Sequence, residues 1–170
     1  MSGILARWNR LPLDAAAHEI LACCGSREWA RRLAAARPIK DEASLIAASD
    51  RIWNNLGPQD WIEAFSQHPR IGEQRVPQAA SAQSAKWSAQ EQQHVASAAG
   101  DIQHAMALAN QEYERRFGRV FLVCATGKSA AELLEVLRRR LRNDPAAELH
   151  VAAEEQRKIT NLRLGKWLQE

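Results

Sequence analysis

A histidine followed directly by a proline, His68-Pro69, is the feature of this sequence that most clearly suggests chemistry. Proline disfavours the helical conformation for the residue before it, so we expect His68 to be extended. The preceding residues 59–66 have a helical pattern, and Pro58 is acceptable in the first turn. An imidazole at the C-terminal end of a helix is favoured in its protonated form by the helix dipole. His68 is therefore a candidate proton donor near neutral pH, although a His-Pro pair by itself also simply marks a turn.

A second group of polar residues, Ser88, Glu91 and Gln92, supplies the side chains that we expect beside His68. Ser88 and Glu91 have the S-x-x-E spacing of a capping box, which predicts that a helix begins at Ser88. On spacing alone, a helix cap explains these two residues better than a catalytic pair does. The two roles are compatible, because the N-terminus of a capped helix attracts an anionic ligand.

These groups must be positioned by a chain whose pattern is helical almost throughout. Apolar residues recur at helical spacing, bounded by capping residues, glycines and prolines. The predicted helices span residues 14–24, 26–37, 41–56, 58–66, 88–117 with a break near 100–101, 129–142 and 144–167. Residues 74–86 are predicted to form a loop, and residues 120–125 a buried extended connector without a partner strand. The sequence thus predicts an all-α single domain over residues 1–170, a bundle of about seven to nine helices.

The composition is that of an ordinary globular protein. Hydrophobic residues make up 46% of the 170 residues, enough to bury a core in one domain. With 25% charged residues and a net charge of +3, the chain is neither disordered nor strongly nucleic-acid-like. Cys23, Cys24 and Cys124 form no C-x-x-C pair, and we expect reduced, buried thiols. Because no signal-like or membrane-spanning stretch is present, we expect a soluble cytoplasmic protein with no membrane partner.

Two other residue patterns suggest alternative functions. Glu91 and His94 have the E-x-x-H spacing of di-iron helical bundles, but such sites need a second copy, so we expect no metal. Residues 138–142, with 157–158 and Arg163, are rich in arginine and suggest a nucleic-acid or protein interaction module built on the C-terminal helices. Acidic residues interleaved with these arginines favour a solvated, salt-bridged helix surface instead, and we expect no nucleic-acid partner.

Several segments, in order along the chain, match the pattern of one known family. They are Cys23-Cys24-Gly25-Ser26 with Trp29 and Arg37-Pro38, residues 65–73 around His68, Ser88-Ala89-Gln90-Glu91-Gln92, residues 113–118 followed by 121–125, and residues 155–164. Together they resemble the 2-oxo-4-hydroxy-4-carboxy-5-ureidoimidazoline (OHCU) decarboxylases of urate and purine degradation, in their bacterial form.

The resemblance implies an all-helical, homodimeric decarboxylase that needs no cofactor. The small-molecule substrate, OHCU, carries a carboxylate and a hydroxyl on one ring carbon, beside a ring C=N that bears a ureido group. Loss of CO2 pushes electrons into that C=N, so the substrate supplies its own electron sink and no cofactor has to supply one. Protonation of the resulting enol on one face gives (S)-allantoin.

The resemblance also implies roles for individual residues. His68 matches the family's acid/base histidine, and Pro69 matches a proline that contacts the substrate and fixes the approach of the imidazole. Glu91, the second catalytic candidate, and Gln92 match the polar pair that holds the substrate, and Ser88 matches a further hydrogen-bonding position. The backbone of a short segment would contact the substrate as well; its residues are Phe121, Leu122, Val123, Cys124 and Ala125.

One departure within the family concerns the residues after His-Pro. Arg70-Ile71-Gly72 stands where vertebrate members have Asp-Leu-Ala. Two roles fit Arg70: an anion-binding charge near the pocket, and an ion pair with Glu73.

Overall fold

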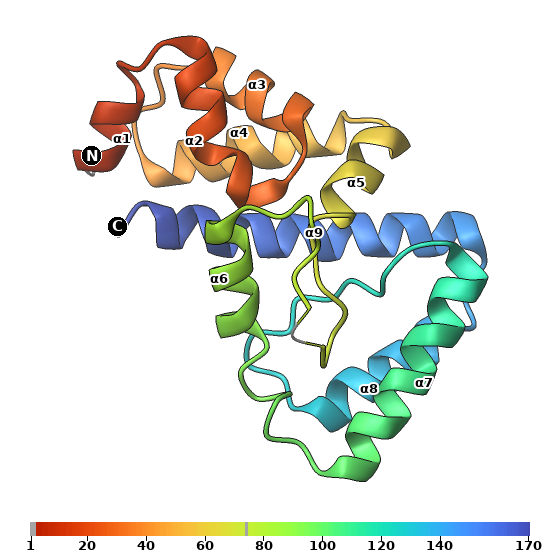
Figure 1. The fold of residues 1–170 in the computed structure, drawn as a ribbon. Coiled ribbons are helices and arrows are strands. Elements are labelled where there is room, and N and C mark those ends of the chain that lie inside the picture. The colour runs from red at the N-terminus through yellow and green to blue at the C-terminus, as the bar shows by residue number, and fades with distance from the viewer. Residues whose placement is uncertain (1–2, 74) are drawn as a thin grey trace. The chain divides into compact units, whose positions relative to one another are not determined.

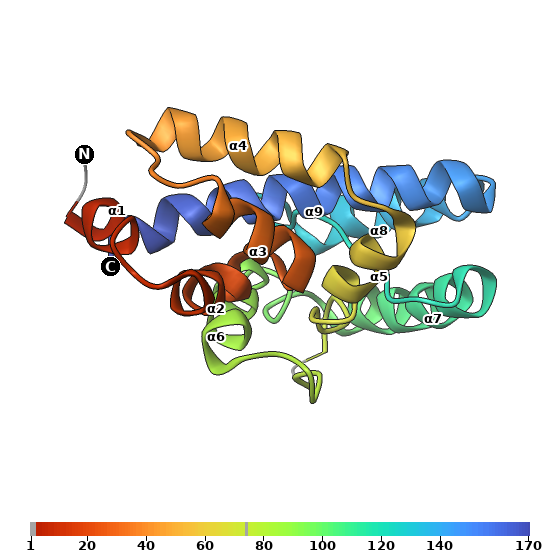
Figure 2. The same cartoon turned by 90° about the horizontal axis from the view of Figure 1, so that it is seen from above.

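The structure, a computed structural model, describes residues 3–73 and 75–170 (Figure 1, Figure 2). No strand occurs among these residues. The nine helices of the described chain are α1 (Gly3–Trp8), α2 (Leu13–Cys24), α3 (Arg27–Ala35), α4 (Glu42–Asn54), α5 (Pro58–Phe65), α6 (Ala82–Glu91), α7 (Gly100–Phe117), α8 (Ala130–Arg140) and α9 (Pro145–Trp167). The predicted all-α class is confirmed.

The chain forms two compact units. The first contains residues 3–64 and 157–170, and the second contains residues 65–156 apart from residue 74. Helix α9 is shared, because its first half belongs to the second unit and its second half to the first.

In the first unit, local signals set the ends of the helices. Gly25 ends α2 with a positive φ of 91°, a conformation that glycine adopts without steric cost. The side chains of Ser26 and Asp41 accept hydrogen bonds from backbone N–H groups in the first turns of α3 and α4. Helix α2 packs on α3, and α3 packs on α4 (Figure 2). At the end of α9, Trp167 meets the fully buried Trp8 edge to face, with ring centroids 5.7 Å apart.

The second unit is centred on α7 and α8, which pack against each other (Figure 1). Gly118 ends α7 in the left-handed conformation, and Ser129 with Glu132 forms the predicted capping box at the start of α8. Residues 120–125 belong to no helix or strand, which confirms the predicted extended connector, and all of them except the half-buried Val120 are buried. The core of this unit includes Ile71, Met106, Tyr113, Phe121, Leu133 and Leu137.

Helix α6 begins earlier than the sequence pattern predicted. Its cap is Ser81, whose hydroxyl accepts a hydrogen bond from the N–H of Ser84 at 3.1 Å. Ser88 therefore lies inside the helix and is 3% exposed, and Glu91 is the last helical residue. The predicted capping box at Ser88 and Glu91 is wrong, because a cap seven residues upstream already satisfies the first turn.

The segments on either side of α6 change accordingly. The predicted loop 74–86 extends only to Ser81, and its first residue, Gln74, lies outside the described residues. Good helix formers in 82–86 and the burial of Trp87 explain why the helix continues through the second half of that range. The predicted break near 100–101 lies instead at residues 92–99, which form turns before α7 begins at Gly100.

Candidate active site

His68 lies just past the C-terminal end of α5, as the His-Pro pattern predicted. Its backbone N–H donates to the carbonyl of Phe65 at 3.2 Å, and the residue lies in a bend. The side chain is buried, with 6% of the residue exposed. Its Nε2 atom lies 2.8 Å from Oε1 of Gln156, a residue of α9 that is fully buried. The imidazole is therefore shielded from bulk solvent, and a hydrogen bond to Gln156 orients it.

The turn that follows His68 is anchored on α7. Arg70 makes a bidentate ion pair with Glu114 of α7, in which Nη2 lies 2.7 Å from Oε2. This hydrogen-bonded pairing raises the pKa of the Arg70 guanidinium. A weaker contact joins Arg70 to Glu73 at 3.3 Å. The ion pair with Glu73 was one of the two roles that the sequence suggested; the principal partner, Glu114, was not predicted.

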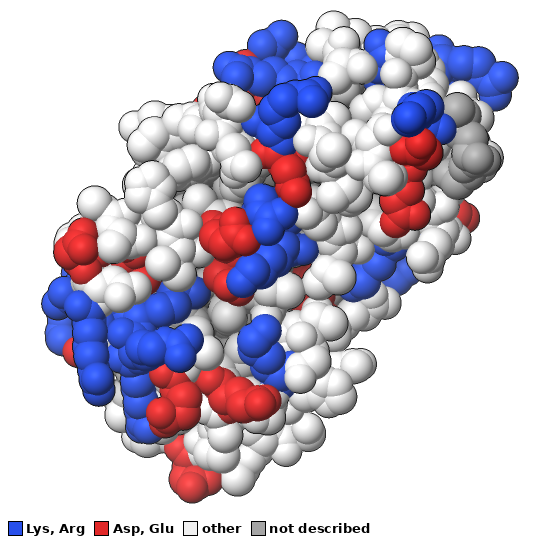
Figure 3. Space-filling model, turned by 180° about the vertical axis from the view of Figure 1, so that it is seen from behind, with Lys and Arg blue, Asp and Glu red and all other residues white. Residues whose placement is uncertain are grey.

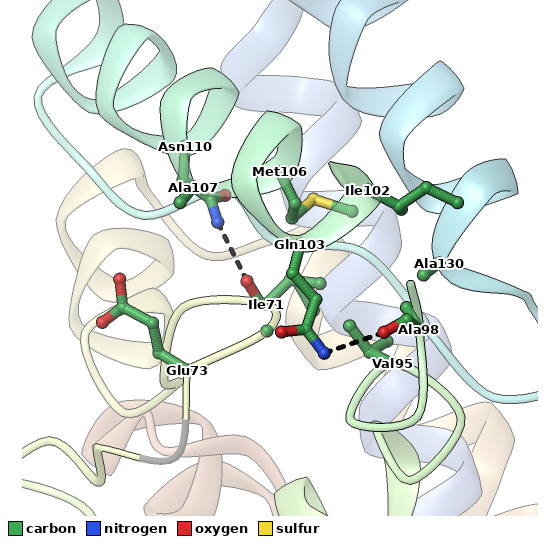
Figure 4. Close-up of a pocket in the computed structure, with 11 residues that line it drawn as sticks. Ile71, Glu73, Val95, Ala98, Ile102, Gln103, Met106, Ala107, Asn110 and Ala130 are labelled. Atoms are coloured by element: carbon green, nitrogen blue, oxygen red, sulfur yellow. Dashed lines mark hydrogen bonds between the residues drawn. The ribbon is translucent and has the colours of Figure 1, made fainter. Parts of the chain in front are cut away.

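A second contact from α7 fixes the next residue of the same turn. The side-chain amide of Asn110, which is 2% exposed, donates from Nδ2 to the carbonyl of Ile71 at 2.9 Å (Figure 4). Beside it lies a small pocket of about 30 Å³, which Ile71 and Met106 help to line. Oδ1 of Asn110 has no hydrogen-bond partner among the described residues. Asn110 and Glu114 are four residues apart and lie on the same face of α7. That face therefore binds Ile71 and Arg70, the two residues after Pro69.

A larger pocket, of about 550 Å³, brings together three of the predicted substrate-binding residues, Pro69, Ser88 and Gln92. Gln92 connects this pocket to the turn, because its Oε1 accepts the backbone N–H of Gly72 at 3.1 Å. With its oxygen engaged in this way, the amide of Gln92 has its –NH2 group left to donate to a ligand. The remaining lining residues are Gly72, Glu73, Val76, Ala85, Ala89, Gln93, Val95, Ala96 and Gln103.

The predicted backbone segment 121–125 does not line this pocket, and neither do His68 and Glu91. All five residues of the segment are buried. Three of its backbone polar groups bind side chains, a type of contact expected for a buried segment outside a sheet. The N–H of Cys124 donates to Glu155 at 2.8 Å, and the carbonyl of Cys124 accepts from Lys128 at 2.9 Å.

Arg140 holds the same segment from the other side. Its Nη1 donates to the carbonyl of Leu122 at 2.6 Å, while Nε and Nη2 bind Oε1 of the fully buried Glu148. Tyr113 donates its hydroxyl to the same carboxylate at 2.5 Å. Burial, followed by this hydrogen bond, raises the pKa of Tyr113. The buried charges of Arg140 and Glu148 are thus paired, and their pairing fixes the backbone at Leu122.

Neighbouring residues of α9 connect the separate parts of the site. Glu155 binds the backbone of Cys124, and the next residue, Gln156, binds His68. The pKa of the Cys124 thiol is raised, mainly by burial and further by the charges of Glu155 and Glu91, against the opposing effect of Lys128. The two hydrogen bonds place His68 and Cys124 beside the same turn of α9.

Sequence reasoning did not assign a role to Glu155, Gln156 or Glu114. The segment 155–164 was recognised as similar to the closing helix of a family, but nothing in it marked the two residues that face the site. Their contacts span 31 to 88 positions of the chain, and a single sequence carries no local signal of such contacts.

The structure also shows the residues that suggested a metal site and an arginine-rich interaction surface. Within residues 3–73 and 75–170, no group of three or more His, Cys, Asp or Glu side chains is arranged to hold a metal ion. On the face shown in Figure 3, Lys and Arg side chains lie beside Asp and Glu side chains. Arg138 pairs with Glu135 at 3.4 Å. The predicted solvated surface is present at that pair, but it is wrong for Arg140 and Arg163, which are 4% and 1% exposed. None of the described helices combines the length and apolarity that crossing a membrane requires.

Comparison with known proteins extends over both units. A model of the OHCU decarboxylase family matches residues 9–165. The chain is 35% identical over 144 residues to the uric acid degradation bifunctional protein TTL of Arabidopsis thaliana, covering 85% of this chain and 44% of that protein. It is 43% identical over 60 residues to the OHCU decarboxylase of Amia calva, covering 35% of this chain and 34% of that one. Each match thus covers less than half the length of the curated relative.

A solved structure is similar along nearly its whole length. The crystal structure of an OHCU decarboxylase in the presence of (S)-allantoin superposes with a TM-score of 0.76 at 34% identity, and the match covers 89% of this chain and 98% of that one. Both the family match and the helical architecture agree with the resemblance to OHCU decarboxylases found in the sequence. The chain belongs to the OHCU decarboxylase family.

Proposed function

We propose that this protein is a cofactor-independent carboxy-lyase that converts OHCU to (S)-allantoin in urate degradation. The observation that carries the proposal is the buried imidazole of His68, held by Gln156 at 2.8 Å in a chain that belongs to the OHCU decarboxylase family. A proton donor in a fixed orientation is what a decarboxylase needs if it is to form one enantiomer.

The substrate itself provides most of the driving force for the reaction. When the bond between the ring carbon and the carboxylate breaks, its electron pair forms a C=C bond with the neighbouring ring carbon. The former C=N then takes a proton on nitrogen, and CO2 leaves. Protonation of the neighbouring carbon, with loss of the hydroxyl proton, converts this enol to the ketone of allantoin. The protein's task is to bind one conformation and to control where the proton arrives.

His68 is proposed to transfer that proton, and Glu91 to hold the substrate beside it. The carboxylate of Glu91 suits the N–H groups of the ureido-imidazoline ring, and the –NH2 of Gln92 suits a carbonyl oxygen. The hydrogen bond from Gly72 to Gln92 supports this assignment, because it engages the amide oxygen. Ser88 and Pro69, which line the same pocket as Gln92, complete the proposed binding set.

The segment 121–125 is proposed to contribute backbone groups to substrate binding. The carbonyl of Leu122 and both backbone groups of Cys124 already have side-chain partners. The carbonyl of Ala125 accepts the backbone N–H of Lys128 at 3.0 Å. We therefore assign the backbone groups of Phe121 and Val123 and the N–H of Ala125 to the substrate.

We also propose that residues 1–170 act as one functional domain, that the protein is a homodimer, and that it works in the cytoplasm on a small molecule rather than on nucleic acid. The family match supports the first point, since it runs from residue 9 to residue 165 through both units. The three cysteines are free and buried, which suits a reducing compartment. Light scattering during gel filtration tests the dimer: twice the monomer mass is expected, and a fully active monomer would contradict it.

The function is tested by generating OHCU in solution from urate and following it by ultraviolet absorbance and circular dichroism. OHCU also decays spontaneously, so the rate and the handedness of the product carry the information. We expect the protein to accelerate the loss of OHCU and to build up the dichroism of (S)-allantoin. Racemic allantoin formed at the spontaneous rate would refute the proposal.

A further inference from the structure

The partner of His68 is a buried amide whose chemistry restricts the state of the imidazole. Oε1 of Gln156 lies 2.8 Å from Nε2 of His68. An amide oxygen only accepts hydrogen bonds, so Nε2 must carry the hydrogen. In the neutral ring the lone pair is then on Nδ1, which becomes the nitrogen that takes up a proton.

The location of Gln156 supports a specific role for this contact. The residue is 0% exposed and lies within the 23 residues of α9, far from either end of the helix. Burying an amide is unfavourable unless its polar atoms are hydrogen-bonded, and an apolar side chain of the same length would avoid that requirement. The neighbouring residue, Glu155, holds the backbone of Cys124, so one turn of α9 supports two parts of the proposed site.

We propose that Gln156 is a positioning residue that holds the neutral imidazole of His68 in the Nε2–H tautomer and fixes the plane of the ring. This inference rests on the proposed function, because Gln156 can affect the reaction only by orienting His68. A histidine that transfers a proton to one face of a planar intermediate must present one nitrogen from one direction, and this hydrogen bond provides that restriction.

Two substitutions separate positioning from packing. Gln156→Met keeps the length of the side chain but removes the acceptor, whereas Gln156→Glu keeps an acceptor oxygen at the same distance from the backbone. Gln111→Met, on the exposed face of α7, makes the same chemical change away from His68 and serves as the matched control. Thermal unfolding followed by circular dichroism checks that each variant folds.

The direct readout is the ¹⁵N spectrum of the imidazole rings, in which His68 is assigned by the signal that disappears in His68→Asn. In the wild-type protein we expect the Nε2–H tautomer. In Gln156→Met we expect a mixture of tautomers and a fall in kcat of roughly 10–100-fold, the usual effect of losing a group that orients a functional histidine, with KM changed much less. Gln156→Glu should restore the tautomer and most of kcat, and Gln111→Met should change neither.

Two results would overturn the proposal. One is a wild-type His68 protonated on Nδ1 rather than Nε2, which the spectrum shows even if every Gln156 variant fails to fold. The other is a folded Gln156→Met protein with unchanged tautomer and unchanged kcat. If the wild-type protein had no decarboxylase activity, the proposed function would fail, whereas the tautomer measurement would still decide the contact between Gln156 and His68.

Discussion

Glu91 is the last residue of α6, and this position determines what its substitution should do. Because it is not part of a helix cap, its replacement removes no capping hydrogen bond. We expect Glu91→Gln to raise KM roughly 10-fold or more, since a hydrogen bond to a charged group contributes about 1.5–3 kcal/mol. Steady-state kinetics measure this change, and Glu135→Gln on the exposed face of α8 should leave KM unaltered. If the Glu91→Gln variant had the KM of the wild type, Glu91 would not bind the substrate.

Gly72 is the residue of the His-Pro turn whose backbone most limits substitution. Its φ is +86°, and a Cβ atom would meet only ordinary contacts, the nearest being Val95 at 3.7 Å. The expected effect of Gly72→Ala is therefore conformational strain of about 1–2 kcal/mol, measured as a lower free energy of unfolding in urea. Gly100→Ala, at the first position of α7, should be neutral or stabilising. Equal stability of Gly72→Ala and the wild type would mean that the turn relaxes into another conformation.

At this scale the sequence predicted the position of His68 but not its partner. Proline restricts the residue before it, so the end of α5 and the placement of His68 follow from local geometry. Gln156 is 88 positions away, and only the packing of α9 brings it to the imidazole. The same holds for Arg70, because Glu73 is close in sequence whereas Glu114, on α7, is 44 positions away.

At the scale of the helices, α7 is the support of the His-Pro turn, through Asn110 and Glu114. We expect Arg70→Glu to displace the turn by charge repulsion and to lower kcat/KM roughly 10-fold or more, because small displacements of a catalytic group are costly. The double variant Arg70→Glu with Glu114→Arg should recover much of that loss, which a double-mutant cycle quantifies.

The control for this charge swap is another bidentate ion pair, Arg7 with Glu19 in the first unit. Reversing the charge of Arg7 should leave kcat/KM unchanged. If the double variant at residues 70 and 114 were no better than Arg70→Glu alone, the pair would not be what orients the turn.

Helix α3 carries a pH-dependent contribution to stability. Hydrogen bonds from Arg31 and then Arg32 lower the pKa of Glu28 from its ordinary value of 4.5 to about 2. A carboxyl group whose pKa is lower in the folded state stabilises the fold above its unfolded pKa, and this contribution is lost as the pH falls through the folded value. Glu28→Gln should therefore be less stable than the wild type at pH 7, and the difference should vanish toward pH 2. Urea unfolding at several pH values measures it, and a constant difference across this range would contradict the assignment.

Helix boundaries were predictable where a cap or a glycine marks them. Gly25, Ser26 and Gly118 act as the sequence indicates, because each signal works through its own backbone and the adjacent turn. The start of α6 was missed because two serines, Ser81 and Ser88, are both chemically able to cap a helix. Burial of Trp87 favours the earlier start, and burial depends on tertiary packing that one sequence does not reveal.

At the scale of the whole molecule, two compact units share α9, and the family match includes both. The proposed site residues from His68 to Gln156 all lie in the second unit. The first unit supplies a separate core built on α2, α3 and α4. Activity should therefore be measured on a protein that contains both units, since the family match runs from residue 9 to residue 165.

The central claim is that His68 directs proton transfer in the decarboxylation of OHCU, and one measurement tests it most directly. The build-up of allantoin dichroism from OHCU is recorded with the wild type, with His68→Asn and with His104→Asn, which replaces an exposed histidine of α7. We predict that the wild type and His104→Asn form (S)-allantoin rapidly, while a folded His68→Asn protein is slower by roughly 10²–10⁴-fold. A folded His68→Asn protein that forms (S)-allantoin at the wild-type rate would contradict this mechanism.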